Sequence, residues 1–116
     1  MLFVCYPKCS TCKKAQDLLD AHGAVYTYRN IKEQNPTEEE LRDWHARSGL
    51  PLKKFFNTSG LLYKELKLKD RLPDMTADEQ FRLLAGDGML VRRPILLTDD
   101  GRVLVGFREA EYEQIL

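Results

Sequence analysis

The first thirty residues constrain the fold most, because they contain a strand, a helix and a second strand in direct succession. Leu2–Cys5 is wholly apolar and precedes a polar turn, which is typical of a strand covered on both faces. Residues 10–22 have apolar side chains at helical spacing, and Gly23 is placed to end that helix. The apolar stripe consists of Ala15, Leu18, Leu19 and His22. Residues 25–31 alternate in polarity, as in a strand. Two strands joined through a helix are expected to be parallel, with a right-handed crossover.

The middle of the sequence predicts helices. Thr37 and Glu40 have the spacing of a capping box, which marks the start of a helix. The buried side of that helix is expected to include Leu41 and Trp44. Residues 49–75 are interrupted by glycines and prolines, so short helical turns are expected there rather than one long helix. Thr76 and Glu79 form a second capping box. The apolar stripe that follows it consists of Phe81, Leu84 and Ala85.

The last part of the sequence predicts a hairpin and a closing helix. Residues 95–97 and 103–105 flank Asp100-Gly101, a strong hairpin signal. Residues 108–116 follow as a helix. The side chains expected to pack inward from it are Tyr112, Ile115 and Leu116. Since the hairpin adds antiparallel strands to a parallel pair, we expect one α/β domain over residues 1–116, with a mixed four-stranded sheet flanked by helices. This is the thioredoxin-like architecture, which by itself settles no chemistry.

The composition argues against several classes of function. Eighteen basic and eighteen acidic residues give a formal net charge of zero, without the basic excess that a nucleic-acid-binding protein needs to neutralise phosphates. The apolar runs are far too short to span a membrane, and the N-terminus lacks the pattern of a signal peptide. Three cysteines without an export signal indicate free thiols in a reducing compartment. We therefore expect a cytoplasmic protein that binds neither membranes nor nucleic acid directly.

Cys9-Ser10-Thr11-Cys12 lies where the first strand gives way to the helix. The first turn of a helix has unpaired N–H groups and the positive end of the helix dipole, and both stabilise a thiolate. Because the thiolate is the reactive form, we expect a lowered pKa at Cys9 and nucleophilic attack by its sulfur. Cys12, one turn further in, is expected to be more buried and to resolve a mixed disulfide. The nearby lysines at positions 8, 13 and 14 add positive charge that salt largely screens.

Two other interpretations of these cysteines stay open. A Cys-x-x-Cys pair can be half of a zinc site, although the sequence has no second pair, and its two histidines, His22 and His45, are not at zinc-finger spacing. The two thiols can also be inert core residues, an interpretation that their position at a helix start disfavours. Cys5 lies within the apolar strand and is interpreted as a small buried hydrophobic residue.

Arg92-Arg93-Pro94 precedes the third expected strand. Proline often opens an edge strand, so this motif alone indicates little. In a thioredoxin-like fold, however, the same place usually holds a cis-proline that faces the cysteines. Pro94 would then turn backbone groups toward Cys9, and Arg93 would offer several N–H donors to an anion there. The lysines of residues 53–69 are expected to form a solvated face.

Together these motifs resemble the family that unites glutaredoxin-dependent arsenate reductases of the ArsC type, Spx regulators and YffB-like proteins. The resemblance covers nearly the whole chain and implies that Cys9 corresponds to the catalytic cysteine of the family's enzymes. The segments that carry it are Tyr6-Pro7-Lys8-Cys9-Ser10-Thr11-Cys12-Lys13-Lys14-Ala15, Arg29-Asn30-Ile31, residues 49–66, Arg92-Arg93-Pro94-Ile95 and Val105-Gly106-Phe107.

The sequence also departs from the pattern of the reductases. By resemblance, these enzymes hold the oxyanion with three arginines, of which one falls at Arg93 and the other two fall at Asn57 and Gly106. Each missing arginine removes charge-assisted hydrogen bonds to the anion. The reductases commonly lack a cysteine at the position of Cys12, so the cysteine pair is more similar to Spx. Spx proteins usually continue past their last helix, whereas this sequence ends at Leu116.

Two functions are therefore open, and we favour the first. In a thiol oxidoreductase, Cys9 forms either an arsenate adduct, which glutathione and glutaredoxin release by family analogy, or a mixed disulfide that Cys12 resolves. The resemblance places Asn57, Arg93 and Pro94 on the substrate-binding side, with glutathione, glutaredoxin or thioredoxin as electron donors and no bound cofactor or metal. In an Spx-like regulator, the Cys9–Cys12 pair is a redox switch in a protein that binds RNA polymerase.

Overall fold

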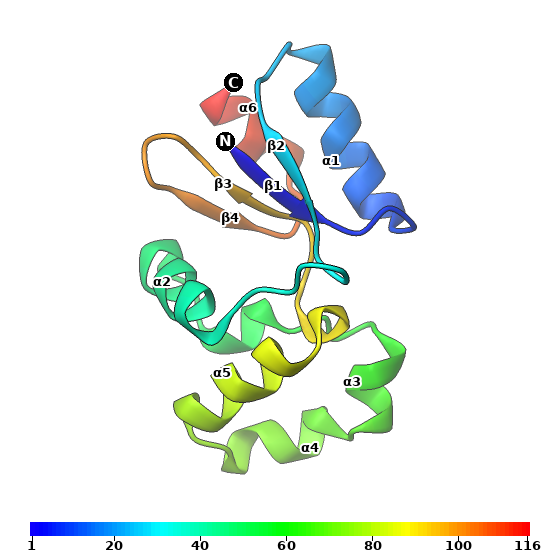
Figure 1. Ribbon diagram of the computed structural model, residues 1–116, viewed down its shortest axis with the longest axis vertical. Helices are drawn as coiled ribbons and strands as arrows, with labels where there is room; N and C mark the ends of the chain where they lie inside the picture. Colours follow the sequence, from blue (N-terminus) through cyan, green and yellow to red (C-terminus); the bar gives the residue numbers. More distant parts are fainter.

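A computed structural model describes residues 1–116 and confirms the mixed four-stranded sheet. The strands are β1 (Leu2–Cys5), β2 (Thr27–Asn30), β3 (Ile95–Leu97) and β4 (Val103–Val105). Their order across the sheet is β2–β1–β3–β4. β1 is parallel to β2 and antiparallel to β3, and β3 pairs antiparallel with β4. The two central strands are therefore β1 and β3, and the sheet has open edges at β2 and β4 (Figure 1).

Helices cover both faces of the sheet. α1 (Ser10–Ala21) and α6 (Glu109–Ile115) lie on one face, and α2 (Glu38–Ser48) lies on the side of the helical half of the molecule (Figure 1). The side chains of β1 alternate accordingly: Phe3 packs in a cluster with residues of α1 and α6, whereas Val4 packs with residues of α2. All the side chains from Phe3 to Cys5 are buried, as predicted for a strand covered on both faces.

The regular elements between β2 and β3 are all helices, and one isolated β-bridge joins Phe56 to Val91. After α2 these helices are η1 (Leu52–Phe55), α3 (Leu61–Glu65), α4 (Leu68–Arg71), η2 (Leu72–Asp74), α5 (Ala77–Gly86) and η3 (Gly88–Leu90). The short turns expected over residues 49–75 are thus confirmed. Both capping boxes are formed, at the starts of α2 and α5. This segment makes the lower half of Figure 1, and the molecule measures 43 × 27 × 24 Å.

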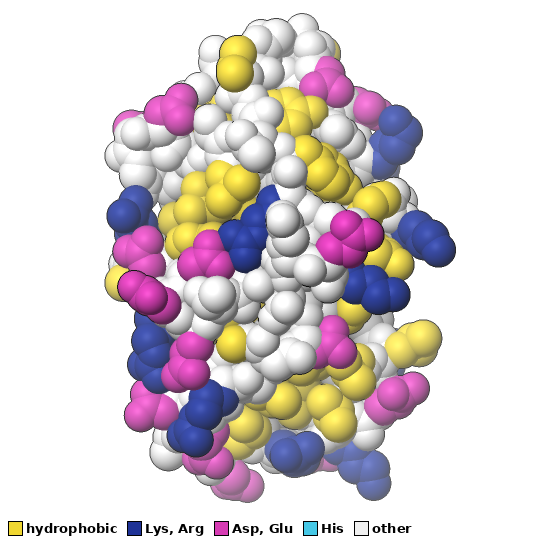
Figure 2. All heavy atoms as spheres, viewed as in Figure 1, with side chains coloured by type: hydrophobic (Ala, Val, Ile, Leu, Met, Phe, Trp, Pro, Cys, Tyr) yellow, Lys and Arg dark blue, Asp and Glu magenta, His cyan; other side chains and the backbone are white.

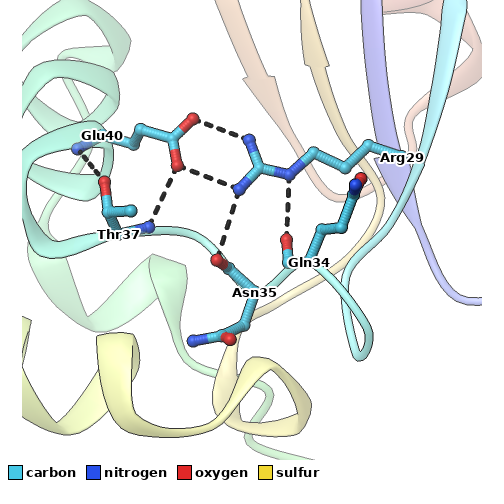
Figure 3. A network of polar contacts seen from close by, with 5 residues as sticks. All are labelled: Arg29, Gln34, Asn35, Thr37 and Glu40. Carbon is cyan, nitrogen blue, oxygen red and sulfur yellow. Dashed lines mark hydrogen bonds and ion pairs between the residues drawn. The ribbon is translucent and has the colours of Figure 1, made fainter.

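A polar network joins the end of β2 to the start of α2 (Figure 3). The Arg29 guanidinium donates to both carboxylate oxygens of Glu40, at 2.6 and 2.9 Å, and to the backbone carbonyls of Gln34 and Asn35. The same carboxylate accepts the backbone N–H of Thr37 at 3.0 Å, which closes the capping box. One side chain of α2 therefore both caps its own helix and holds that helix against the sheet.

Three details of the sequence prediction were wrong. The second strand is shorter than residues 25–31, because it pairs with only four residues of β1, and Val25 is 85% exposed. His22 is exposed rather than part of the apolar stripe, since α1 ends at Ala21 and Gly23 reverses the chain with a φ of 66°. Leu116 is exposed because it lies beyond the last helical turn.

The surface mixes charges of both signs. In the view of Figure 2, basic and acidic side chains are interspersed, with apolar atoms showing between them. None of the helices combines the length and the apolar character that crossing a membrane requires.

Candidate active site

Cys9 occupies the N-cap position of α1. Its backbone is extended (φ −95°, ψ 121°), and its sulfur accepts the backbone N–H of Cys12 at 3.5 Å. In this position a side chain normally satisfies one of the free N–H groups of the first helical turn. A thiolate is a better acceptor for that N–H than a thiol, so the cap itself favours the ionised form of Cys9.

Several groups act on the pKa of the half-buried Cys9 thiol. Burial acts to raise this pKa, but hydrogen bonds from the backbone and side chain of Cys12, together with the Arg93 guanidinium, lower it below its usual value. Among the lysines near the motif, Lys13 is paired with Asp17 at 3.3 Å on the exposed surface of α1. The positive charge that stabilises the Cys9 thiolate therefore comes from Arg93, at the other end of the chain.

Cys12 lies behind Cys9 in the core between the sheet and α1. Only 2% of it is exposed, and its sulfur accepts the backbone N–H of Tyr6 at 3.4 Å. Its pKa is raised, first by a hydrogen bond that its thiol makes to Cys5 and then by burial. Cys12 is thus a protonated thiol next to a more accessible sulfur with a lowered pKa. Cys5 is buried as expected, and its contact with Cys12 is an addition that the sequence pattern did not reveal.

The peptide bond between Arg93 and Pro94 is cis, in agreement with the expectation for this fold. The Arg93 guanidinium lies 5.2 Å from the centre of the Tyr6 ring, in the turn that precedes Cys9. Its Nε and Nη1 atoms are buried and have no hydrogen-bond partner. Buried guanidinium nitrogens are almost always paired, so two without a partner are unusual. Arg93 therefore has unused hydrogen-bond donors beside the reactive sulfur.

A surface hollow of about 470 Å³ opens beside Arg93 and is also lined by Asn57. The structure thus brings together these two residues of the predicted substrate side. Two carboxylates, Glu65 and Asp87, line the same hollow, and Cys9 does not. The acidic lining makes the hollow less favourable to an oxyanion than a site lined by arginines alone.

Gly106 contacts Arg92 rather than Arg93. A Cβ atom at Gly106 would lie 2.8 Å from Nε of Arg92, and the glycine has a φ of 77°, which other residues rarely adopt. Its N–H donates to the carbonyl of Pro94 at 2.8 Å. Gly106 therefore holds the backbone of the cis-proline through this hydrogen bond. A side chain at position 106 would collide with Arg92.

The sequence did not predict three features of this region. They are the hydrogen bond from the backbone N–H of Tyr6 to the Cys12 sulfur, the two carboxylates of the hollow, and the contact between the free thiols of Cys5 and Cys12. Only the position of Tyr6 next to the motif gave a signal. No cluster of three or more His, Cys, Asp or Glu side chains has an arrangement that could hold a metal ion.

The sheet order, the cysteine pair at the start of α1 and the adjoining cis-proline define a thioredoxin-like protein with a Cys-x-x-Cys site. Comparison with known proteins narrows this class. The model of the ArsC family matches residues 5–115. The chain belongs to the ArsC family.

The similar proteins include an uncharacterized protein, a transcriptional regulator and a possible arsenate reductase. The chain is 52% identical to the uncharacterized protein YusI of Bacillus subtilis, over 98% of this chain and 96% of that protein. It is 31% identical to the global transcriptional regulator Spx of Staphylococcus epidermidis, over 95% of this chain and 82% of Spx. A structure described as a possible arsenate reductase from Streptococcus mutans superposes with a TM-score of 0.89, at 44% identity, covering 99% of this chain and 97% of that one.

Proposed function

We propose that this protein is a thiol–disulfide oxidoreductase in which Cys9 is the nucleophile and Cys12 is the resolving thiol. The observation that carries the proposal is the contrast between the two sulfurs. Cys9 is half-buried, caps a helix and has a lowered pKa, whereas Cys12 is buried with a raised pKa. Attack requires an accessible thiolate, and resolution requires a second thiol that is held nearby and protected from solvent.

The reaction proceeds in two exchange steps. The Cys9 thiolate attacks one sulfur of a substrate disulfide, forms a mixed disulfide and releases the other sulfur as a thiolate. Cys12 then loses its proton to that leaving thiolate and attacks the sulfur of Cys9. The Cys9–Cys12 disulfide forms and the second substrate thiol leaves, so the substrate gains two electrons and the protein loses two.

Arg93 assists both steps through its charge. Its guanidinium stabilises the Cys9 thiolate before attack. Its free Nε and Nη1 donors suit the thiolate that leaves when Cys12 attacks, because hydrogen bonds to an anion are stronger than those to a neutral group. The electron donor that reduces the Cys9–Cys12 disulfide again is glutathione, glutaredoxin or thioredoxin in this proposal, by analogy with the family.

Arsenate is at most a poor substrate in this proposal. Arg93 is the single arginine at the positions that bind the oxyanion by resemblance, and Glu65 and Asp87 line the hollow next to it. Hydrogen bonds to charged groups are typically worth ~1.5–3 kcal/mol each. Two missing arginines therefore weaken oxyanion binding by ~3–6 kcal/mol if their contributions add, or by two to four powers of ten in affinity at ~1.4 kcal/mol per tenfold change.

Reaction of the reduced protein with hydroxyethyl disulfide, followed by mass spectrometry, tests the proposal. We expect the wild type to end with a Cys9–Cys12 bridge, and Cys12→Ser to accumulate the hydroxyethylthio adduct on Cys9. Cys9→Ser should form neither product. Cys5→Ala is the matched control and should behave as the wild type does. An adduct on Cys12, or a Cys5–Cys12 bridge as the main product, would contradict the assignment of roles.

The similarity to Spx favours a second candidate function, in which the same cysteine pair is a redox switch of a transcriptional regulator. By the Spx resemblance, the partner would be RNA polymerase. Binding of the reduced and the oxidised protein to purified bacterial RNA polymerase separates the two functions. A complex that forms with only one redox state supports the regulator, and no complex with either state supports the enzyme.

A further inference from the structure

The edge strand β4 lines a groove whose charged side chains are almost all basic. The groove has a volume of about 380 Å³, and all three residues of β4 contribute to its wall. Its basic residues are Arg47, Lys54, Arg92, Arg102 and Arg108, and Glu111 is its one acidic residue. They come from α2, η1, the segment before β3, the hairpin and the start of α6. β4 is the edge of the sheet opposite β2 (Figure 1).

Two of the three residues of β4 have backbone groups without a partner strand. Leu104 pairs with Leu96 in the antiparallel register. On either side of it, the Arg102 carbonyl accepts the N–H of Thr98, and the Gly106 N–H donates to the carbonyl of Pro94. Alternate residues of an antiparallel strand direct their backbone groups to opposite sides. The N–H and C=O groups of Val103 and Val105 therefore point away from β3, and such an edge can pair with a further strand.

Basic side chains are distributed along the whole edge. Arg47 reaches the hairpin turn, where its Nη1 lies 3.7 Å from the position of a Cβ on Gly101, and Arg92 lies over Gly106 at the other end of β4. Arg47 and Arg102 each pair with an exposed aspartate. No ion pair involves Lys54, Arg92 or Arg108, so these three cations are available to an acidic ligand.

We propose that this groove binds a short, extended, acidic segment of another protein, which adds a strand to β4. Backbone hydrogen bonds to Val103 and Val105 would set the register, and acidic side chains would meet the cations on either side. Pairing of two copies through β4 is disfavoured, because each would bring the same positive charge. This inference goes beyond the proposed function, since Cys9 does not line the groove.

Fluorescence anisotropy with a labelled peptide, Asp-Val-Glu-Val-Asp-Val-Glu, tests the charge requirement. We expect Lys54→Glu combined with Arg108→Glu to weaken binding at least tenfold. The matched control, Lys64→Glu combined with Lys69→Glu, makes the same change of net charge outside the groove and should change the affinity less than twofold. Cys9→Ser should bind the peptide as the wild type does, because Cys9 does not line the groove. Peptide binding is therefore tested independently of the proposed oxidoreductase activity. Equal loss in both double variants would overturn the proposal.

Amide hydrogen exchange measured by NMR tests the added strand. The peptide should slow exchange at Val103 and Val105 at least tenfold and leave Leu104 unchanged, because that N–H already faces β3. A peptide of the same charge with proline at each valine position cannot form the ladder and should bind at least tenfold more weakly. Unchanged exchange at both valines would overturn the proposal. So would equally tight binding of a single-stranded oligonucleotide, or a dimer whose formation protects the same two amides.

Discussion

Two arginines in this protein each lie beside an aromatic ring, but the guanidinium of one is fully hydrogen-bonded and that of the other is not. Arg29 and Arg93 both lie beside an aromatic ring, at 5.8 Å from Trp44 and 5.2 Å from Tyr6. Arg29 makes four hydrogen bonds, two of them to the Glu40 carboxylate. Arg93 has two buried guanidinium nitrogens without a partner. The first arginine is fully used within the fold, and the second keeps donors free next to Cys9.

This difference distinguishes a structural arginine from one that acts on the chemistry of a neighbouring group. A buried donor without a partner is destabilising, so it persists where a function compensates for it. The pKa values agree with this division. The Arg29 hydrogen bonds hold the pKa of Glu40 at about 2. Arg93 contributes to the lowered pKa of Cys9.

The largest expected effect is a loss of stability in Arg29→Met. This substitution leaves the Glu40 carboxylate and two backbone carbonyls without their donor. Loss of one partner of a buried ion pair costs ~3–5 kcal/mol, and the pair here is partly exposed, so we expect the free energy of unfolding to fall by about 2–3 kcal/mol. Urea unfolding followed by Trp44 fluorescence measures it.

Arg42→Met is the matched control for this prediction. Arg42 also lies beside a ring, that of Phe81 at 4.6 Å, and pairs with Glu38 and with Asp78 of α5, but these ion pairs are exposed. Exposed ion pairs contribute little to stability, so the loss should be much smaller than in Arg29→Met. Equal losses of stability in the two variants would contradict the structural role assigned to Arg29.

Arg93→Met should have the reverse profile. Its two buried nitrogens without a partner make no hydrogen bond to lose, and methionine keeps the apolar contact with Tyr6, so the free energy of unfolding should change by less than ~1 kcal/mol. The pKa of Cys9 should rise, because the positive charge that favours the thiolate is gone. Alkylation of Cys9 at pH 7 should slow severalfold.

The pH dependence of alkylation distinguishes this electrostatic effect from a structural one. The whole profile should move to higher pH in Arg93→Met, and the rates of the variant and the wild type should converge once both thiols are ionised. Cys9 should also react well before Cys12 or Cys5 in both proteins. A lower plateau at high pH with an unchanged midpoint would show that Arg93 acts on access to the sulfur and not on its pKa.

An effect on stability smaller than that of Arg29→Met is expected from Glu40→Gln, and it depends on pH. The pKa of Glu40 is lowered from 4.5 to about 2 in the folded protein. A lowered pKa stabilises the fold above the unfolded value and loses this contribution as pH falls through the folded value. The difference between the wild type and Glu40→Gln should therefore be about 1–2 kcal/mol near pH 6, allowing for solvent at the carboxylate, and shrink between pH 4.5 and 2. A difference independent of pH would contradict it.

Local patterns predicted the elements of the fold, and they predicted the site only where its residues are neighbours in sequence. The apolar run of β1, the two capping boxes and the Asp100-Gly101 turn each depend on a few adjacent residues, and all of them are confirmed. The ends of elements were less accurate, as at His22, because tertiary contacts decide where a helix stops.

Pairing between distant side chains was not predictable. Arg29 and Glu40 were each singled out, one in a family motif and one in a capping box, but nothing in the sequence indicated that they bind each other. The free donors of Arg93 were equally hidden, since the absence of a partner is a property of the packed structure. Its position beside Cys9 was expected from the place of the cis-proline in a thioredoxin-like fold and not from a local pattern.

The smallest expected effect concerns arsenate, and it asks whether Arg93 can be converted into part of an oxyanion site. Asn57→Arg places a second cation in the hollow beside Arg93, but Glu65 and Asp87 line that hollow and offset the new charge. In steady-state assays with glutathione and glutaredoxin, we expect a slow wild type and less than ~10-fold improvement in kcat/KM for arsenate, which corresponds to less than ~1.4 kcal/mol. Adding Glu65→Gln should increase the gain, because it removes one of the opposing charges. Gly106 is left unchanged, since its φ of 77° and the nearby Arg92 exclude a larger side chain. Unfolding curves of both variants show whether they are folded. A wild type that reduces arsenate at a low KM would show that Arg93 alone suffices for the anion, and arsenate would then replace disulfides as the substrate.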